Sequence, residues 1–214
     1  MSAARRPVAS ASGRERRPVA SASGRERKRS LAAVCSVLPE EAAARVLDLW
    51  AELDRELGLR AATISPLPHF SYQVARDYDI DVLQEVVERV ARGARALRVQ
   101  TAGLGIFTGD SPVLHVPIVR SPELARFQVA VWSAASVAAG KIDQHYHPAS
   151  WIPHVSLAFG DTTPANVGAA VELLARRDLA WDLELDNLSI VKGAGQRPQE
   201  LVARYPLEGV ARNF

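Results

Sequence analysis

Two short strings in the sequence carry residues that could perform acid–base chemistry. Residues 68–72 read PHFSY and residues 153–157 read PHVSL, so a proline, histidine, apolar, serine, apolar pattern occurs twice. The two histidines are 85 positions apart. A single histidine two residues before a serine is a common accident, but two copies that share the flanking proline and apolar positions are not. The repetition therefore indicates a function common to both strings.

Strand geometry would place the polar residues of each copy on one face. In a β-strand, residues i and i+2 point to the same side, about 6.6–6.8 Å apart. His69 and Ser71 would then share one face while their apolar neighbours enter the core, and His154 and Ser156 would do the same. If the two strands face each other, two imidazoles and two hydroxyls meet in a volume the size of a phosphate group.

Such a set of groups suits phosphodiester chemistry. Because imidazole titrates near neutral pH, one histidine can act as a base and the other as an acid on the opposite side of the phosphorus. The two hydroxyls can donate hydrogen bonds to the non-bridging oxygens. A structural role, in which each buried histidine bonds a carbonyl, is the alternative interpretation. Polar pairs repeated on one strand face are hard to explain by packing alone.

The paired strings resemble the signature of the two-histidine (2H) phosphoesterase superfamily, also called the 2′-5′ RNA ligase and cyclic phosphodiesterase family. Its members carry a tandem pair of His-x-Ser/Thr-apolar motifs, one in each lobe. The resemblance covers residues 31–208 and includes Trp151 upstream of the second motif. It implies that His69 and His154 are catalytic and that Ser71 and Ser156 bind the phosphate. Family members often have threonine at the hydroxyl positions, and serine holds the hydroxyl less rigidly.

The resemblance also implies a bilobed α+β fold and metal-independent chemistry without a cofactor. The expected substrates are 2′,3′-cyclic or 2′-5′ phosphodiesters of RNA ends or nucleotides, with hydrolysis favoured over reversible 2′-5′ RNA ligation. Family precedent favours His154 as the base and His69 as the acid that protonates the leaving oxygen. Two alternatives stay open. One is a non-catalytic RNA-end or nucleotide-binding module on the same fold, and the other is an enzyme for a cyclic dinucleotide or another small phosphodiester.

Other residues near the second motif have two interpretations each. Tyr146 and Trp151 could stack a nucleobase or simply pack. His145 and His147 could point two imidazoles at a metal ion, but no third ligand follows at a motif-like spacing, so no metal site is expected. His115 lies inside an apolar run and is expected to be a hydrogen-bonded core or edge residue.

The elements that must position these residues follow from the hydrophobic pattern. Helices are predicted at 40–57, 81–96, 122–139 and 165–177, and strands at 31–38, 69–75, 98–107, 113–119, 154–159, 180–191 and 199–206. Each motif begins a strand at an equivalent place in two similar halves of about 80–90 residues. Strands near hairpin spacing favour an α+β fold with antiparallel pairing. We expect two pseudo-symmetric lobes, each with an antiparallel sheet and outer helices, and an active-site cleft between them.

The composition is that of an ordinary globular protein. The chain has 214 residues, 48% of them apolar, which is ample for a core. Its one cysteine, Cys35, excludes an intrachain disulfide framework. No run approaches 18 uninterrupted apolar residues, so no membrane span is expected. We expect a cytoplasmic monomer that acts on RNA ends or a small nucleotide.

The first 30 residues differ from the rest of the chain. They hold nine basic and two acidic side chains, a net charge of +7, whereas the remainder carries −5. Residues 6–16 recur letter for letter as residues 17–27. The composition predicts a disordered basic tail over 1–30, either a phosphate-attracting arm or, as we favour, a duplicated dispensable extension. The predicted 2H phosphoesterase domain then spans 31–208, and 209–214 form a C-terminal tail.

Overall fold

The computed structural model of the protein describes residues 30–65, 67–193 and 199–209. Ten strands and four α-helices account for most of this part of the chain. The helices are α1 (Glu40–Leu57), α2 (Ile80–Gly93), α3 (Pro122–Ala135) and α4 (Val167–Leu174). Single turns of 3-10 helix are η1 (Ala61–Ile64), η2 (Ser136–Ala138) and η3 (Gln144–Tyr146). No helix among these residues combines the length and the apolar character that a bilayer crossing requires.

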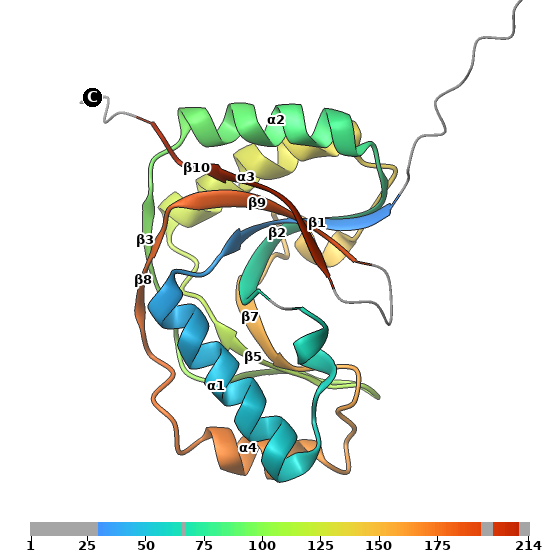
Figure 1. The fold of residues 1–214 in the computed structure, drawn as a ribbon, viewed down its shortest axis with the longest axis vertical. Helices are drawn as coiled ribbons and strands as arrows, with labels where there is room; N and C mark the ends of the chain where they lie inside the picture. Colours follow the sequence, from blue (N-terminus) through green and yellow to red (C-terminus); the bar gives the residue numbers. More distant parts are fainter. Residues whose placement is uncertain (1–29, 66, 194–198, 210–214) are drawn as a thin grey trace, which may run out of the picture.

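The larger lobe is built on a five-stranded sheet in the order β10-β9-β1-β2-β6. Its strands are β1 (Ser30–Val37), β2 (His69–Tyr78), β6 (Lys141–Ile142), β9 (Asn187–Lys192) and β10 (Glu200–Pro206). Every neighbouring pair is antiparallel. Helices α2 and α3 cover one face of this sheet, which leaves the other face toward the second lobe (Figure 1).

The smaller lobe holds the second motif. Its three-stranded sheet has the order β4-β5-β7, and a two-stranded sheet pairs β3 with β8, again all antiparallel. The strands are β3 (Leu97–Gln100), β4 (Gly105–Phe107), β5 (Val113–Pro117), β7 (His154–Ala158) and β8 (Asp182–Leu185). Helix α1 packs on β7 and α4 packs on α1, so these two helices form the outer layer here (Figure 1). The predicted α+β fold with antiparallel sheets in two lobes is confirmed.

Each lobe draws strands from both halves of the chain. The first motif strand, β2, shares its sheet with β9 and β10 from the second half, and the second motif strand, β7, pairs with β5 from the first half. The two similar halves of the sequence therefore do not correspond one to one with the two lobes. The structure interlaces them instead, because β5 pairs across to β7 and β9 pairs across to β1.

Several predicted elements have the expected boundaries, and two apolar runs do not. Helix α1 ends where predicted, at Gly58, whose left-handed φ of 69° is readily adopted only without a Cβ. The Ser121 hydroxyl caps α3 by accepting a hydrogen bond from the Leu124 amide. The predicted strand 98–107 is divided into β3 and β4, and 180–191 into β8 and β9. In both cases the chain leaves one sheet and enters another. Both parts carry apolar residues, so the hydrophobic pattern alone predicts a single strand.

Most residues of the two predicted tails lie outside the part of the chain that the structure describes. Residues 1–29 lie outside the described residues, so the disordered tail stays a prediction, and β1 begins at Ser30. At the other end, the Gly209 amide donates a hydrogen bond to the Ala94 carbonyl at 2.7 Å. Residues 210–214 also lie outside the described residues.

Asn187 connects the sheet to the end of β2 that carries the first motif. The ladder between β1 and β9 stops at the pair Cys35 and Ser189. Beyond it, the Asn187 side chain takes the place of a strand: its Oδ1 accepts the Val37 amide at 3.1 Å, and its Nδ2 donates to the Val37 carbonyl at 2.9 Å. Val37 is the β1 partner of His69. A buried side chain therefore continues the hydrogen bonding to the level of the first histidine.

Replacing Asn187 by leucine should lower the free energy of unfolding by about 2–4 kcal/mol. The Val37 peptide groups and the Ser189 hydroxyl, which donates to Asn187 Oδ1, would lose their partner in the interior. Urea denaturation measures the change. The control is Gln100→Leu on β3, where an exposed side chain bonds Asp182 and the expected change is within about 0.5 kcal/mol. Equal losses in both variants would contradict the role given to Asn187.

Candidate active site

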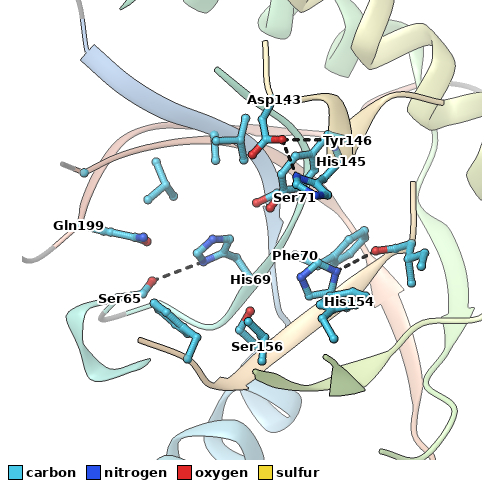
Figure 2. Close-up of a pocket in the computed structure, with 18 of the residues that line it drawn as sticks. Ser65, His69, Phe70, Ser71, Asp143, His145, Tyr146, His154, Ser156 and Gln199 are labelled. Carbon is cyan, nitrogen blue, oxygen red and sulfur yellow. Dashed lines mark hydrogen bonds and ion pairs between the residues drawn. The ribbon is translucent and has the colours of Figure 1, made fainter. Parts of the chain in front are cut away.

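A pocket of about 920 Å³ lies between the two lobes, and both motif strands line it. His69 and Ser71 enter it from β2, and His154 and Ser156 enter it from β7. The two imidazoles point into the same space, with Ser156 near both (Figure 2). The structure thus brings together the four residues that the sequence analysis selected. A pocket of this size is in the range that small ligands occupy.

The alternation predicted for the first motif is present, and a bulge then changes its phase. His69 and Ser71 are half-buried at the pocket, whereas Phe70 and Tyr72 are 1% and 0% exposed. In the pairing with β1, Cys35 faces Ser71 and Val34 faces Gln73, so Tyr72 is the extra residue of a β-bulge. After the bulge, Val74 lines the pocket. The polar face of the strand therefore ends at Ser71.

Both histidines are held in the same way by the residue two positions before them. His69 Nδ1 lies 2.8 Å from the Leu67 carbonyl oxygen, and His154 Nδ1 lies 2.7 Å from the Ile152 carbonyl oxygen. A carbonyl only accepts, so each Nδ1 carries a proton and donates it. Each neutral ring then has its lone pair on Nε2. In this tautomer, Nε2 is the nitrogen that can take up a proton from a bound molecule.

Burial lowers the pKa of both histidines below the usual 6.5. For His69, desolvation is the main cause, the bond to Leu67 opposes it, and a positive charge on His154 lowers the pKa further. For His154, desolvation lowers the pKa and the bond to Ile152 opposes it. The electrostatic coupling means that the pair prefers to hold at most one proton. One proton shared by two imidazoles is the state in which one ring is a base and the other an acid.

Two tryptophans at the pocket clamp the motif strands by bonding their backbone carbonyls. The Trp151 indole donates to the Ser71 carbonyl at 2.9 Å, and the Trp50 indole on α1 donates to the Ser156 carbonyl at 3.1 Å. Each motif serine thus has its side chain toward the pocket and its carbonyl bonded by an indole. Because Trp151 lies three residues before the start of β7, its bond ties the second motif to the first. Trp50 ties β7 to α1.

The loop before β7 forms one wall of the pocket and carries Tyr146. Gln128 of α3 donates to the Tyr72 carbonyl at 3.1 Å and to the Tyr146 carbonyl at 2.9 Å, so it holds the loop against β2. The Tyr146 hydroxyl lies close to the Ser71 side chain, and burial, with a smaller effect of Asp143, raises the pKa of Tyr146 to about 12. Of the two residues considered for base stacking, Trp151 is 2% exposed, which favours its packing role. For Tyr146, which is half-buried at the pocket, stacking stays a prediction.

The remaining histidines have separate surroundings. His145 is at the pocket wall, where its Nδ1 lies 2.9 Å from an Asp143 carboxylate oxygen, whereas the His147 ring packs edge-on against Trp132. No group of three potential metal-ligating side chains gathers within the described ranges. His115 is 3% exposed and its Nδ1 lies 3.4 Å from the Val113 carbonyl oxygen, so the predicted hydrogen-bonded core position is confirmed.

Sequence reasoning missed several residues that shape the site. Ser65 lies 3.4 Å from His69 Nδ1 and lines the pocket, and Trp50 was not connected with the motifs. A signal for Ser65 exists, because the repeat is longer than five residues. A serine stands four positions before each histidine, at Ser65 and Ser150, and both line the pocket. No such signal exists for Trp50, because it lies on a helix outside both motifs in the sequence and reaches Ser156 only in the folded chain.

Comparison with known families identifies one match. The family model described as the 2′-5′ RNA ligase superfamily matches residues 38–197. This range contains both motifs, all four helices and the two clamping tryptophans. Among curated proteins, no sequence matches the chain.

Solved structures with the same fold are distant in sequence. TT0787 of Thermus thermophilus superposes with a TM-score of 0.58 at 15% identity, over 84% of this chain and 98% of that one. LigT of E. coli in complex with 3′-AMP gives a TM-score of 0.58 at 12% identity, over 84% and 99%. LigT in complex with NADP+ gives 0.55 at 13% identity, over 84% and 98%. At these identities the likeness establishes the fold.

Replacing either clamping tryptophan by phenylalanine should disturb the motif strands. Each variant leaves a carbonyl without its donor, which should lower the free energy of unfolding by about 1–3 kcal/mol. The matched control is Trp181→Phe, because the Trp181 indole also bonds a carbonyl, that of Asp178, but away from the pocket. All three variants should lose stability in urea. Only Trp50→Phe and Trp151→Phe should shift the imidazole NMR signals of His69 and His154, and a similar shift in Trp181→Phe would refute the clamp.

Proposed function

Since the chain belongs to the 2′-5′ RNA ligase superfamily, we propose that it is a metal-independent phosphodiesterase that uses His69 and His154 as an acid–base pair. Its proposed substrates are the 2′,3′-cyclic or 2′-5′ phosphodiesters of RNA ends or nucleotides. The observation that carries the proposal is the matched pair of imidazoles, each with Nδ1 on a carbonyl and Nε2 available in one pocket. Reversible 2′-5′ ligation is the same chemistry with a ribose hydroxyl in place of water.

The proposed reaction needs one proton on the histidine pair. Neutral His154 takes a proton from water through Nε2 as the water oxygen attacks phosphorus. Protonated His69 gives its proton to the ribose oxygen whose bond to phosphorus breaks. The water thus adds across the bond, and the pair ends the turnover with the proton on His154. Transfer of that proton back to His69, through solvent, restores the starting state.

The hydroxyl groups would stabilise the charge on the phosphate. Ser71 and Ser156 project from the two strands beside the histidines and can donate to the two non-bridging oxygens. Ser71 also lies close to the Tyr146 hydroxyl, a further polar group beside the proposed phosphate position.

The ligands of the related structures support a nucleotide substrate. LigT of E. coli has been solved with 3′-AMP and with NADP+, both of which contain a nucleoside and a phosphate. In this chain, Tyr146 gives the pocket an aromatic side chain near Ser71 on which a base could stack. The pocket is also large enough for a nucleotide beside the phosphate-binding groups.

His69→Ala and His154→Ala should each reduce turnover of a nucleoside 2′,3′-cyclic phosphate by at least about 10²-fold. Each variant removes one of the two proton transfers, which typically contribute about 10²–10⁴-fold. The product is quantified by chromatography, with and without a chelator, and folding is checked by circular dichroism. His147→Ala is the control, because this histidine packs on Trp132 away from the pocket. Full activity in either motif variant would refute the proposal, and tight binding without any product would favour a binding module.

The pH profile of kcat/KM should be a bell with its maximum below pH 6.5. This parameter reports the free enzyme, in which burial lowers the pKa of both histidines, so the singly protonated pair is most abundant on the acid side of 6.5. Activity falls at higher pH as the acid loses its proton and at lower pH as the base gains one. Initial rates at constant ionic strength give the profile. A maximum above pH 7 would contradict the burial argument.

A further inference from the structure

His115 has no role in the proposed reaction, but its ring lies against that of His154, which does. The centroids of the His115 and His154 rings are 5.1 Å apart, with an angle of 64° between the rings. Phe107 stacks on His115 at 4.0 Å and 21°, and it meets the His154 ring edge-on at 4.9 Å. Each of the three rings therefore contacts the other two. His154 is the member of this cluster that carries out chemistry in the proposed function.

The strand register explains why the rings meet. β5 lies between β4 and β7, where His115 pairs with Gly105 on one side and with Ser156 on the other. His154 is two residues from Ser156 along β7, so its side chain is a diagonal neighbour of His115 on the same face of the sheet. The His115 ring thus supports His154 from the strand next to it.

Gly105 provides the space in which the His115 ring lies. A Cβ atom at position 105 would come within 2.4 Å of His115 Nε2, closer than side chains approach one another. The glycine lets the imidazole lie over the backbone of β4, with Phe107 stacked on it. The ring therefore has one defined place, fixed by a strand partner without a side chain and by an aromatic neighbour.

His115 is neutral in the pH range where the proposed chemistry takes place. Burial, and secondarily the charge of His154, lowers its pKa to about 4. A neutral ring can pack against His154 in both of its protonation states, whereas a cation would repel the imidazolium form. Within the described ranges, His154 interacts electrostatically with His115 of β5 and with His69 of β2.

We propose that His115 is a positioning residue: its ring, placed over Gly105 and against Phe107, fixes the orientation of the His154 imidazole. With the ring fixed, His154 keeps Nδ1 on the Ile152 carbonyl and Nε2 toward the pocket. This inference rests on the proposed function for its effect on turnover, but not for its effect on the state of His154. On the other strand, the additional neighbour of His69 is Ser65, whose hydroxyl lies 3.4 Å from His69 Nδ1.

Three variants test the role of the flat ring. His115→Leu keeps an apolar side chain at this position but removes the planar ring. His115→Phe keeps a planar ring but removes the nitrogens. Gly105→Ala keeps the imidazole but displaces it. We expect kcat on a nucleoside 2′,3′-cyclic phosphate to fall about 10- to 100-fold in the leucine and alanine variants, with KM within about threefold, because misplacing a catalytic group acts on the chemical step. His115→Phe should stay within about threefold of the native protein.

Imidazole ¹⁵N NMR gives a readout that needs no turnover. In the native protein, neutral His154 should be the Nδ1–H tautomer, and it should remain so in His115→Phe. His115→Leu and Gly105→Ala should give a mixture of Nδ1–H and Nε2–H forms, since the bond to Ile152 is no longer enforced. His147→Ala should change neither kcat nor the tautomer. If the native protein has no phosphodiesterase activity, the proposed function fails while the tautomer measurement still decides the role of His115.

The outcomes separate clearly. Native kcat and tautomer in both His115→Leu and Gly105→Ala would overturn the proposal. Equal losses in His115→Leu and His115→Phe would also overturn it, because the nitrogens rather than the plane would then matter. A leucine variant that loses stability but keeps the Nδ1–H tautomer would show that His115 is only a packing residue.

Discussion

The site depends on two strands that face each other without a shared ladder of hydrogen bonds. If β2 and β7 paired directly, their backbones would lie about 4.8 Å apart and no ligand could enter. Unpaired strand carbonyls, however, are costly when buried. Indole groups solve this conflict, because Trp151 and Trp50 satisfy the carbonyls of Ser71 and Ser156 from the side. The strands remain apart, and the space between them becomes the pocket.

The two half-buried imidazoles of the site lower the stability of the fold while they provide the groups for acid–base chemistry. Placing two imidazoles where solvent is largely excluded opposes their protonation, as the lowered pKa values of His69 and His154 record. Two backbone carbonyls limit this penalty, and they also determine which nitrogen is available. The hydrogen bonds that make burial tolerable are therefore the ones that orient the rings. Structural and functional demands coincide at Leu67 and Ile152.

Much of the site could be predicted from the sequence because the motifs are local. A histidine and a serine two residues apart face the same way on any strand, so His69 with Ser71 and His154 with Ser156 follow from the spacing alone. Other residues that hold them are not local: Trp50 and Gln128 reach the motifs through tertiary contacts, and Gly105 leaves room for the His115 ring beside His154. The fold divides similarly. The helices and the caps at Gly58 and Ser121 were predictable. The interlacing of the halves depends on which strands pair, and periodicity contains no information about partners.

The pairing of β1 with β9 has a consequence for how the protein acquires its shape. β1 is among the first described elements, yet its neighbour begins at Asn187, about 150 residues later. A chain with such distant partners has a high contact order, and the entropy of closing these loops must be overcome before the contacts form. During synthesis, β1 and β2 can pair early, but their sheet is complete only after β9 and β10 leave the ribosome. The five-stranded sheet of the larger lobe would then be completed last, after the strands β4, β5 and β7 of the smaller lobe have been made.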